Sequence, residues 1–428
     1  MREMKDSGIE WIGEIPVDWS MKRVKHIFTR KNEKAMQENP TILSLARDGV
    51  KVRDISNNEG QIAESYYNYN PVEEGDLLLN PMDLYSGANC SISKVQGVIS
   101  PAYINLKANT GVNPDFYDYY FKVQYWLMAF FSYGKGVSYD NRWTLSAEAL
   151  MNYPVVDLSY EEQCKRADYL DRKCSQIDAI IARQQEVIEK LKAYKLSVIT
   201  EAVTKGLNPD VPMKDSGIDF IGSIPETWRI CRLRNIGTLQ NGISKGGEFF
   251  GHGFPFVSYG DVYRNFSLPV QVTGLIDSSD EERRNYSVEA GDIFFTRTSE
   301  TIEEVGFSSV CEETIPDATF AGFLIRVRPF TDDLVPKFAK YYFRSNHHRY
   351  YLVKQMNLVT RASLGQDLLK SMPVLVPPKD EKISIAAYLD KKCGAIESSI
   401  EYKQRVIERL TAYKKSLIYE VVTGKKAV

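Results

Sequence analysis

The amino-acid sequence predicts an α+β fold: two globular mixed α/β domains joined by two long helices, which form an antiparallel coiled coil with approximate two-fold symmetry. Three observations predict it. The chain repeats itself at a period of about half its length, and each copy ends in a long segment with coiled-coil periodicity. Its 428 residues are also enough for two or three domains that each bury a core.

The repeat is clearest at the start of each half. Residues 4–16 (MKDSGIEWIGEIP) return as residues 213–225 (MKDSGIDFIGSIP), an offset of 213 − 4 = 209, and Trp19 returns as Trp228. Later in each half the offset settles at 219, because Tyr169-Leu170-Asp171 matches Tyr388-Leu389-Asp390. Between such anchors the two copies differ freely. One scaffold therefore carries two unlike surfaces.

The repeat divides the chain into four predicted segments. The first globular domain covers residues 1–157, the central long helix 158–206, the second globular domain 207–376, and the C-terminal long helix 377–428.

Short β-rich runs alternate with turn signals inside the globular domains. Gly75-Asp76 and Gly291-Asp292 predict tight turns that lead into buried strands. Other predicted strands include 98–99 and 254–259, and residues 116–131 and 338–353 each predict a helix. This pattern indicates a mixed α/β domain without assigning its topology.

The first long helix is predicted over Glu161–Val203, a segment without glycine or proline. Ser159 and Glu162 form a plausible capping box before it, and Gly206 follows as a stop. The second helix begins after Pro377-Pro378 and tolerates one internal glycine, Gly394. Positions at alternating steps of four and three predict the pairing seam, with Cys174 and Gln184 of the first helix and Cys393 and Lys403 of the second among them. Its main apolar residues are Leu170, Ile177, Ile181, Ile188 and Leu191 in the first helix, and Leu389, Ile396, Ile400, Ile407 and Leu410 in the second.

A helix of ~43 residues would span roughly 65 Å, much more than a small domain is wide. Its apolar stripe needs a partner, and the two seams match position for position. Each globular region leads into its own helix, so pairing the helices antiparallel places one domain at either end. The alternative is that each helix merely flanks its own domain.

Composition and motifs argue against several classes of protein. Net charge is −2, and no run of 18 apolar residues predicts a membrane span or a signal-peptide core, so a cytoplasmic location is expected. The six cysteines are scattered and the four histidines lack metal-ligand spacing, so no metal site is predicted. Residues 80–83 (NPMD) are only faintly similar to an adenine-methyltransferase motif. No catalytic residue is therefore assigned, which favours a binding role.

Polar, basic and aromatic residues gather in segments that differ between the halves. Arginine, asparagine, threonine and tyrosine side chains can read base edges or grip phosphates. At the offset of 219, Arg142 and Arg361 occupy equivalent places. The candidate DNA-binding residues are Lys135, Tyr139, Asn141, Arg142, Ser244, Lys245, Tyr259, Arg264, Arg297, Thr298, Thr360 and Arg361.

Taken together, the chain resembles the specificity subunits of type I restriction–modification systems over essentially its whole length. The resemblance rests on the duplicated openings, on Ala193-Tyr194-Lys195 and Ala412-Tyr413-Lys414 in the long helices, and on Val203-Thr204-Lys205-Gly206-Leu207 between the copies. It implies two target-recognition domains, each of which reads one half of a split double-stranded DNA sequence. Since the variable segments are unlike, we expect an asymmetric, bipartite target.

The same resemblance implies partners and cofactors. The paired helices would set the spacing of the half-sites and dock DNA methyltransferase subunits, expected to be two, and restriction–translocase subunits would join the larger assembly. S-adenosylmethionine, ATP and magnesium are expected on those partner subunits, with no cofactor in this chain. The alternatives are a coiled-coil assembly scaffold without DNA readout, and a fused nuclease or methyltransferase, which the missing motifs disfavour.

Overall fold

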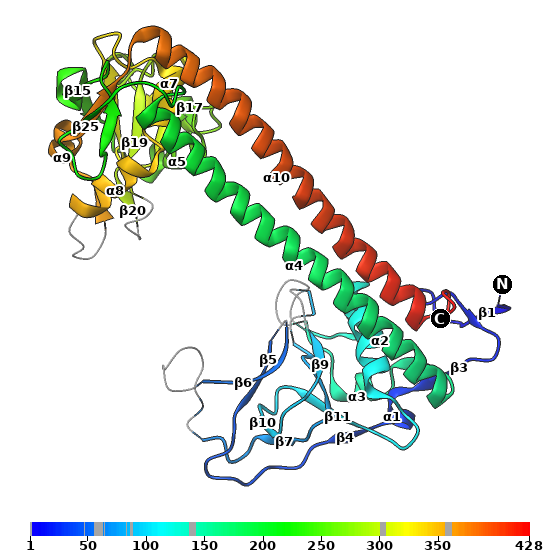
Figure 1. The fold of residues 1–428 in the computed structure, drawn as a ribbon. Coiled ribbons are helices and arrows are strands. Elements are labelled where there is room, and N and C mark those ends of the chain that lie inside the picture. Colours follow the sequence, from blue (N-terminus) through cyan, green and yellow to red (C-terminus); the bar gives the residue numbers. More distant parts are fainter. Residues whose placement is uncertain are drawn as a thin grey trace. The chain divides into compact units, whose positions relative to one another are not determined.

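The computed structural model describes residues 2–46, 48–54, 63, 65–82, 84–85, 89–136, 143–299, 305–355 and 362–428. The chain forms two compact units. Unit 1 consists of Met1–Gln184 with Arg405–Val428, and unit 2 of Gln185–Gln404. Two long helices, α4 (Tyr160–Lys205) and α10 (Lys379–Val422), each begin in one unit and end in the other (Figure 1). The units thus divide each helix, and the four boundaries inferred from sequence stay a prediction.

Unit 1 is built on a four-stranded antiparallel sheet of order β4-β11-β8-β9. Its strands are β1 (Met4–Asp6), β2 (Glu14–Pro16), β3 (Ser20–Arg23), β4 (Phe28–Lys31), β5 (Leu43–Ala46), β6 (Gly49–Val52), β7 (Asn70–Val72), β8 (Leu77–Leu79), β9 (Cys90–Ile92), β10 (Gly97–Ile99), β11 (Ile104–Ala108) and β12 (Pro154–Asp157). Its shorter helices are α1 (Val24–Ile27), α2 (Pro114–Trp126), the 3₁₀ helix η1 (Ala129–Tyr133) and α3 (Ala147–Met151).

Unit 2 repeats this sheet in the order β16-β23-β19-β21, again antiparallel. Its strands are β13 (Met213–Asp215), β14 (Ser223–Pro225), β15 (Arg229–Arg232), β16 (Gly237–Asn241), β17 (Phe250–Val257), β18 (Leu275–Ile276), β19 (Ile293–Thr296), β20 (Thr298–Ser299), β21 (Ser308–Val310), β22 (Thr319–Phe320), β23 (Leu324–Pro329), β24 (Ala362–Ser363) and β25 (Pro373–Val376). Its helices are η2 (Leu233–Asn235), η3 (Gly247–Phe249), α5 (Tyr259–Arg264), α6 (Asp280–Asn285), α7 (Pro336–Tyr342), α8 (Asn346–Gln355) and α9 (Gln366–Ser371).

The duplicated scaffold extends beyond the sheets. The repeated opening forms the hairpin β1–β2 in unit 1 and β13–β14 in unit 2, and the ladder β3–β12 corresponds to β15–β25. The additions differ: unit 1 has the pairs β5–β6 and β7–β10, whereas unit 2 has β17 between β18 and β22, and the pair β20–β24. A common scaffold with unlike additions agrees with the predicted duplication.

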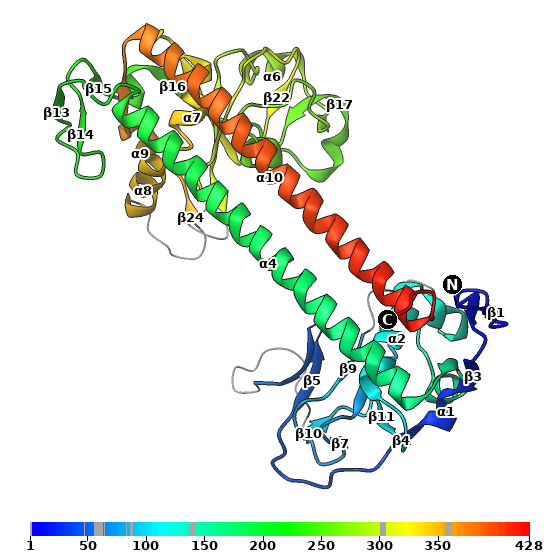
Figure 2. The same ribbon diagram turned by 45° about the vertical axis from the view of Figure 1, so that its right-hand side comes forward.

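The long helices pack antiparallel within each unit. In unit 1, Arg166 Nη1 of α4 donates to the carbonyl of Val421 in α10 (2.7 Å), and Asp178 forms an ion pair with Lys414. Residue numbers rise along α4 as they fall along α10, so the helices run in opposite directions. In unit 2, Lys195 of α4 forms an ion pair with Glu397 of α10. Figures 1 and 2 show α4 and α10 side by side.

The predicted seam residues lie along this pairing. Five are buried and five half-buried; the buried ones are Leu170, Ile177, Ile188, Leu389 and Ile396, and the half-buried ones are Ile181, Leu191, Ile400, Ile407 and Leu410. Leu170 and Ile177 share the core of unit 1 with the end of α10, and Leu389 shares the core of unit 2 with the end of α4. Each long helix therefore contributes to the cores of both units.

Each long helix is followed within two residues by a glycine in the left-handed region, Gly206 (φ +78°) and Gly424 (φ +77°). An equivalent tryptophan lies beside the start of each helix. The indole Nε1 of Trp19 donates to Glu162 Oε2 (3.1 Å), and that of Trp228 donates to Glu381 Oε2 (2.9 Å). Both tryptophans are buried, so the two copies anchor their long helices in the same way.

Two predicted helices are shorter than the sequence indicated. The segment 116–131 is not one helix, because α2 ends at Trp126 and Met128 adopts a left-handed conformation (φ +56°) before η1. The segment 338–353 divides into α7 and α8. Between them, the side chain of Arg344 donates to four backbone carbonyls, and these tertiary bonds replace a continuous helix: Ser308, Val262, Tyr263 and Asn265.

One predicted strand also ends early. The sequence indicated a strand over 254–259, but β17 ends at Val257 and Tyr259 begins α5. Ser258 caps this helix, because its hydroxyl accepts from the backbone N–H of Asp261 (3.3 Å). The two predicted tight turns are confirmed: Gly75 and Gly291 have positive φ values (89° and 94°) just before β8 and β19.

Candidate nucleic-acid interface

Several segments meet at one edge of the four-stranded sheet in unit 2. At this edge β16 and β19 end and β23 begins, because Asn241 is paired with Ile325 and Thr296 with Leu324. We define the polar edge of unit 2 by the segments at these strand ends, 241–245, 297–298 and 321–323, together with 364–366, which is hydrogen-bonded to Arg297. These residues come from four separate stretches of the chain.

Backbone hydrogen bonds join the segments of the polar edge. Gly322 N–H donates to the Ile243 carbonyl (2.7 Å), and Arg297 N–H donates to the Phe323 carbonyl (2.9 Å). The Arg297 carbonyl in turn accepts from Leu364 N–H (2.7 Å). Since these bonds join all four segments, the side chains on them are presented on a firm support.

Glycine is required where the loops come closest. A Cβ at Gly242 would lie 2.2 Å from the Phe320 carbonyl oxygen, and a Cβ at Gly322 would lie 2.1 Å from the Ser244 hydroxyl oxygen. The first clash is with backbone and cannot be relieved by a side-chain rotation. The side-chain amide of Gln366 adds a bond to Asn241 Oδ1 (2.9 Å).

The structure brings several predicted site residues to this edge. Ser244 is exposed beside Gly322, and Arg297 and Thr298 are half-buried next to the Phe323 carbonyl. Thr298 is paired with Ser363 in the short ladder β20–β24. Hydroxyl and guanidinium groups are therefore displayed together on the supported loops.

Two other predicted residues lie on α5. The ring of Tyr259 stacks on that of Tyr263 (5.8 Å between centroids), and Tyr263 meets Phe307, which directly precedes β21. Ala321 N–H donates to the carbonyl of Val257 (3.1 Å), so Tyr259, two residues later, begins α5 close to the polar edge. Arg264 is exposed at the opposite end of this six-residue helix.

Lys245 belongs to the polar edge by position, but its side chain is directed elsewhere. Its Nζ donates to the Asp277 carbonyl (2.8 Å) and to Glu282 Oε2 (2.7 Å), and its side chain is 17% exposed. The ammonium is thus neutralised inside unit 2. Of the predicted residues described here, Lys245 is the least available to a phosphate.

In unit 1, the predicted residue Lys135 lies at the equivalent edge. Its backbone is paired with that of Thr144 (2.9 and 3.0 Å). The following residues are tied to the segment after β8, because Leu84 N–H donates to the Trp143 carbonyl and Leu145 N–H donates to the Pro81 carbonyl. Lys135 itself is exposed. The predicted residues Tyr139, Asn141, Arg142, Thr360 and Arg361 lie outside the described residues.

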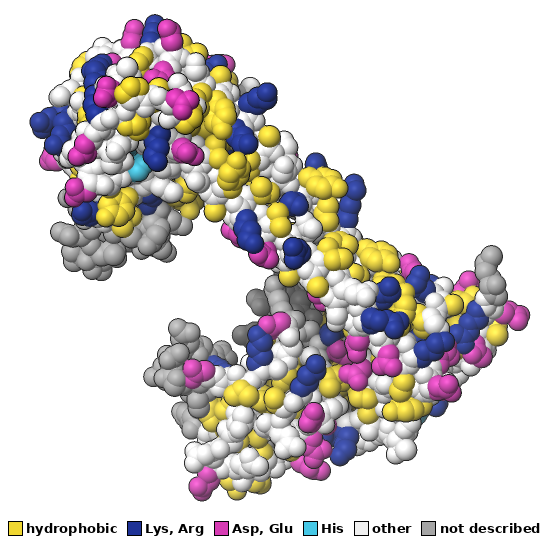
Figure 3. All heavy atoms as spheres, in the orientation of Figure 1, with side chains coloured by type: hydrophobic (Ala, Val, Ile, Leu, Met, Phe, Trp, Pro, Cys, Tyr) yellow, Lys and Arg dark blue, Asp and Glu magenta, His cyan; other side chains and the backbone are white. Residues whose placement is uncertain are grey.

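Several arginines of unit 2 have internal roles. Arg328 donates to both carboxylate oxygens of the buried Asp292 (2.7 and 2.6 Å). Arg344 is occupied by four carbonyls, and burial together with the nearby charge of Arg349 lowers its pKa to about 10. On the face shown in Figure 3, Lys and Arg side chains alternate with Asp and Glu and do not form one broad basic patch.

The search for polar groups in the sequence missed an aromatic residue. Phe323 forms the tip of the turn between β22 and β23, where Leu324 N–H donates to the Ala321 carbonyl (2.9 Å), and it is 64% exposed. The signal in the sequence is the small pair Ala321-Gly322 directly before an aromatic residue. That pattern marks a turn only once the flanking strands are known.

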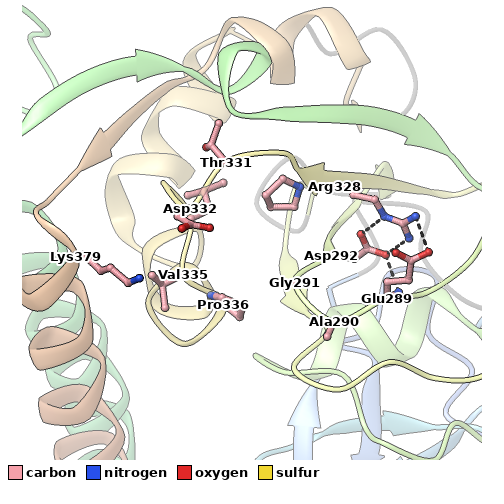
Figure 4. Close-up of a pocket in the computed structure, with 12 residues that line it drawn as sticks. Glu289, Ala290, Gly291, Asp292, Arg328, Thr331, Asp332, Val335, Pro336 and Lys379 are labelled. Carbon is pink, nitrogen blue, oxygen red and sulfur yellow. Dashed lines mark hydrogen bonds and ion pairs between the residues drawn. The ribbon is translucent and has the colours of Figure 1, made fainter.

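A pocket of about 370 Å³ lies at the opposite edge of the same sheet (Figure 4). There Glu289 and Asp292 precede β19, Arg328 comes from the end of β23, and Lys379 begins α10. The Arg328 guanidinium lies between the two carboxylates, so its charge is already compensated (Figure 4). Of the predicted DNA-binding residues that the structure describes, none lines this pocket.

Among the described residues, no group of three or more His, Cys, Asp and Glu side chains is arranged to hold a metal ion. In the same part of the chain, no helix is both long enough and apolar enough to cross a membrane.

The chain is similar over most of its length to curated specificity subunits of type I restriction enzymes. It is 24% identical to the EcoKI specificity subunit of Escherichia coli strain K12 over 293 residues, which is 64% of this chain and 58% of that subunit. It is 22% identical to the MjaVIII specificity subunit of Methanocaldococcus jannaschii over 430 residues, 96% of this chain and 93% of that subunit. No protein-family model matches the chain.

Solved structures share the fold. A chain from a study of complex assembly and conformational transition of the type I R-M system has a TM-score of 0.72 at 14% identity, over 96% of this chain and 99% of its own length. The HsdS subunit from Thermoanaerobacter tengcongensis has a TM-score of 0.52 at 14% identity, with 96% and 98% covered. The two-copy architecture is therefore that of solved type I subunits.

Proposed function

We propose that this chain is the DNA-sequence-recognition subunit of a type I restriction–modification complex and is not itself catalytic. The similarity to curated specificity subunits over most of the chain carries this proposal. In this role each unit reads one half of an asymmetric, bipartite target. The shared sheet with unlike loops at the same edge supports that division, because a common scaffold can then present different side chains to different base pairs.

The reading residues are proposed at the polar edge of unit 2 and at the equivalent edge of unit 1. Hydroxyl and guanidinium groups hydrogen-bond to base edges and phosphates, and Ser244, Arg297 and Thr298 offer them on firmly tied loops. Lys135 adds a positive charge in unit 1. Tyr259, Arg264 and the predicted residues outside the described part of the chain remain candidates for the same role.

The paired helices are proposed to set the distance between the half-sites. A helix lengthens by about 1.5 Å per residue, so the number of residues in the packed helices would set the distance between the two reading domains. The proposed segments are those inferred from the repeat: domains over 1–157 and 207–376, and spacer helices over 158–206 and 377–428.

Docking of two methyltransferase subunits is supported by exposed residues that are identical in the two helices. Gln185, Glu189, Ala193 and Ser197 of α4 lie four residues apart on one stripe, and α10 has the same four residue types 219 positions later. Tyr194 and Tyr413, beside these stripes, are 48% and 55% exposed. Other exposed positions of the two helices differ, such as Lys192 and Thr411, so a partner shared by both helices is a reason why these positions are identical. Restriction–translocase subunits would join that assembly. S-adenosylmethionine, ATP and magnesium would be bound by these partner subunits and not by this chain.

The proposal is tested by producing the full chain with the methyltransferase subunit of its own system and mapping methylated bases by single-molecule sequencing. We expect one bipartite motif with two different halves, and no methylation of that motif when the chain is omitted. Replacing residues 20–155 by those of a related specificity subunit should change one half of the motif only. Methylation that is independent of the chain would contradict the proposal.

The second candidate function is an assembly scaffold, which the ion-paired helices alone would also support. A scaffold would bring the partners together without protecting DNA. Footprinting of the complex with its methyltransferase separates the two, because a reading subunit protects bases in two patches, whereas a scaffold leaves the pattern of the methyltransferase unchanged.

A further inference from the structure

Phe323 presents an exposed aromatic ring at the polar edge of unit 2. The ring is 64% exposed, and the neighbouring segments carry Ser244, Arg297 and Thr298. Other aromatic residues are exposed as well, among them Phe330 at 60%, and exposure alone does not mark a site. What distinguishes Phe323 is its place among hydroxyl and guanidinium groups on loops that are tied to one another.

The backbone that carries this ring is held from three sides. The Phe323 carbonyl accepts from Arg297 N–H (2.9 Å), Gly322 N–H donates to Ile243 (2.7 Å), and Ala321 N–H donates to Val257 (3.1 Å). The backbone of Gly322 lies close to that of Ile243, because a Cβ at Gly322 would lie 3.1 Å from the Ile243 carbonyl oxygen. The backbone below the ring therefore needs no further ordering when the ring binds, which lowers the entropic cost of contact with a ligand.

Unit 1 has a different residue at this place. Asn105 is paired with Leu78 and Lys31, and Arg326 is paired with Phe294 and Gln240, so Asn105 corresponds to Arg326 and Ala102 corresponds to Phe323. Ala102 is exposed but carries no ring. The exposed ring at this edge is therefore a feature of unit 2, which agrees with unlike side chains on a common scaffold.

We propose that Phe323 is a specificity-determining residue whose ring contacts the apolar surface of one base in the half-site read by unit 2. This inference rests on the proposed function. Two kinds of apolar base surface fit a single exposed phenyl ring, namely the C5 methyl of a thymine in the major groove and the face of a base at an opened step. Arg297 and Ser244 alongside it would hydrogen-bond to neighbouring groups of the same site.

The chain offers a matched control. Phe330 follows the opposite end of β23, is 60% exposed, and is also fixed by its backbone, because its N–H donates to the Ile236 carbonyl (3.1 Å). Phe323→Ala and Phe330→Ala therefore remove the same side chain from the two ends of one strand. Only the first change lies at the polar edge.

The experiment maps methylation by complexes that contain the full chain, Phe323→Ala or Phe330→Ala, each with its methyltransferase. With Phe323→Ala we expect relaxed preference at one base pair, in the half that does not change when residues 20–155 are exchanged. The discrimination at that base pair should fall by about 5- to 100-fold. With Phe330→Ala the motif should be unchanged.

Synthetic duplexes of the mapped target then identify the base surface. If the ring contacts a thymine methyl, replacing that thymine by deoxyuridine weakens binding by the unchanged complex but not by the Phe323→Ala complex. If it contacts an opened step, 2-aminopurine at that step becomes fluorescent only with the unchanged complex. If neither response is observed, the proposed contact between Phe323 and a base is overturned.

The other outcomes are equally distinct. An unchanged motif with Phe323→Ala overturns the inference while leaving the proposed function intact. Failure of the Phe323→Ala chain to assemble, at an unchanged unfolding temperature, would instead assign the ring to a protein partner and overturn the inference. Absence of any chain-dependent motif with the unchanged protein would remove the proposed function itself.

Discussion

The Nζ atom of Lys414 lies 2.7 Å from Oδ2 of Asp178 and joins α10 to α4 within unit 1. At the offset of 219, Asp178 corresponds to Glu397 and Lys195 corresponds to Lys414. Lys195 and Glu397 form the equivalent ion pair in unit 2. Each acidic residue thus pairs with the lysine that the other copy of the repeat supplies. Such a reciprocal pattern is what an antiparallel pair of duplicated helices requires.

Exchanging the charges of this pair tests the register of the helices. Asp178→Lys and Lys414→Asp should each lower the free energy of unfolding, since each places like charges together, and the double variant should recover most of the loss. The interaction energy between the two side chains, taken from the double-mutant cycle, should be about 0.2–1 kcal/mol. It is small because the Asp178 side chain is 56% exposed and water screens the charges. Urea unfolding of the four proteins measures it. Additive losses would show that the two side chains do not interact in solution.

Lengthening the helices tests whether they act as a spacer. Inserting one heptad after Gln184 and another after Lys403 keeps the apolar seam in phase and adds about 10 Å, which corresponds to about three base pairs. We expect the mapped motif to keep both halves while its unread centre becomes longer. A heptad in one helix alone should disturb spacing or assembly. A motif with its original spacing after the paired insertion would exclude the spacer role.

His348 predicts an acid sensitivity of unit 2. It is buried between the rings of Tyr342 and Phe343, and burial together with His347 lowers its pKa to about 3. The unfolded chain takes up this proton below about pH 6.5, whereas the folded chain does so only near pH 3. The free energy of unfolding should therefore fall between pH 6.5 and 3, by up to ~1.4 kcal/mol per pH unit. His348→Asn should remove this part of the dependence, and an unchanged slope would contradict the assignment.

Glu162 predicts that the stability of unit 1 also depends on pH, over a lower pH range than that of His348. Burial opposes its ionisation, but hydrogen bonds from Arg2, Arg166 and Trp19 lower its pKa to about 2. A carboxylate with a lowered pKa stabilises the fold above its unfolded pKa of about 4.5, and this contribution is lost as the pH falls toward 2.

The matching variant is Glu162→Gln, which keeps an acceptor for Trp19 and removes the charge. This variant should lower the free energy of unfolding by about 1–3 kcal/mol at neutral pH. The difference in free energy of unfolding from the unchanged protein should shrink as the pH falls from 4.5 to 2. Chemical denaturation at several pH values measures this. A difference that stays constant with pH would show that the charge of Glu162 contributes nothing.

The sequence predicted the large features because their signals are local or repeated. The spacing of Leu170, Ile177 and their counterparts is readable within one helix, and the repeated openings predicted two copies directly. The helix over 338–353 was wrong for the opposite reason. Its break depends on Arg344, which reaches carbonyls 36 to 82 residues away, and no local pattern announces such bonds.

The candidate site was predicted only in outline. The sequence selected Ser244, Arg297 and Thr298, and the structure joins their loops at one edge. It also selected Lys245, whose charge is neutralised by Glu282, 37 residues further along the chain. Phe323 was missed because its exposure depends on a turn that only the neighbouring strands define.

The sequence by itself determined that the protein has two copies of one scaffold and two long helices with matching seams. Both properties follow from helix periodicity and from direct repetition, which need no knowledge of distant contacts. Only the tertiary structure decided which loops share an edge, which arginines serve the interior, and which aromatic ring is left exposed. These outcomes depend on strand register and on hydrogen bonds between residues far apart in the chain, and such pairings leave no periodic trace in the sequence.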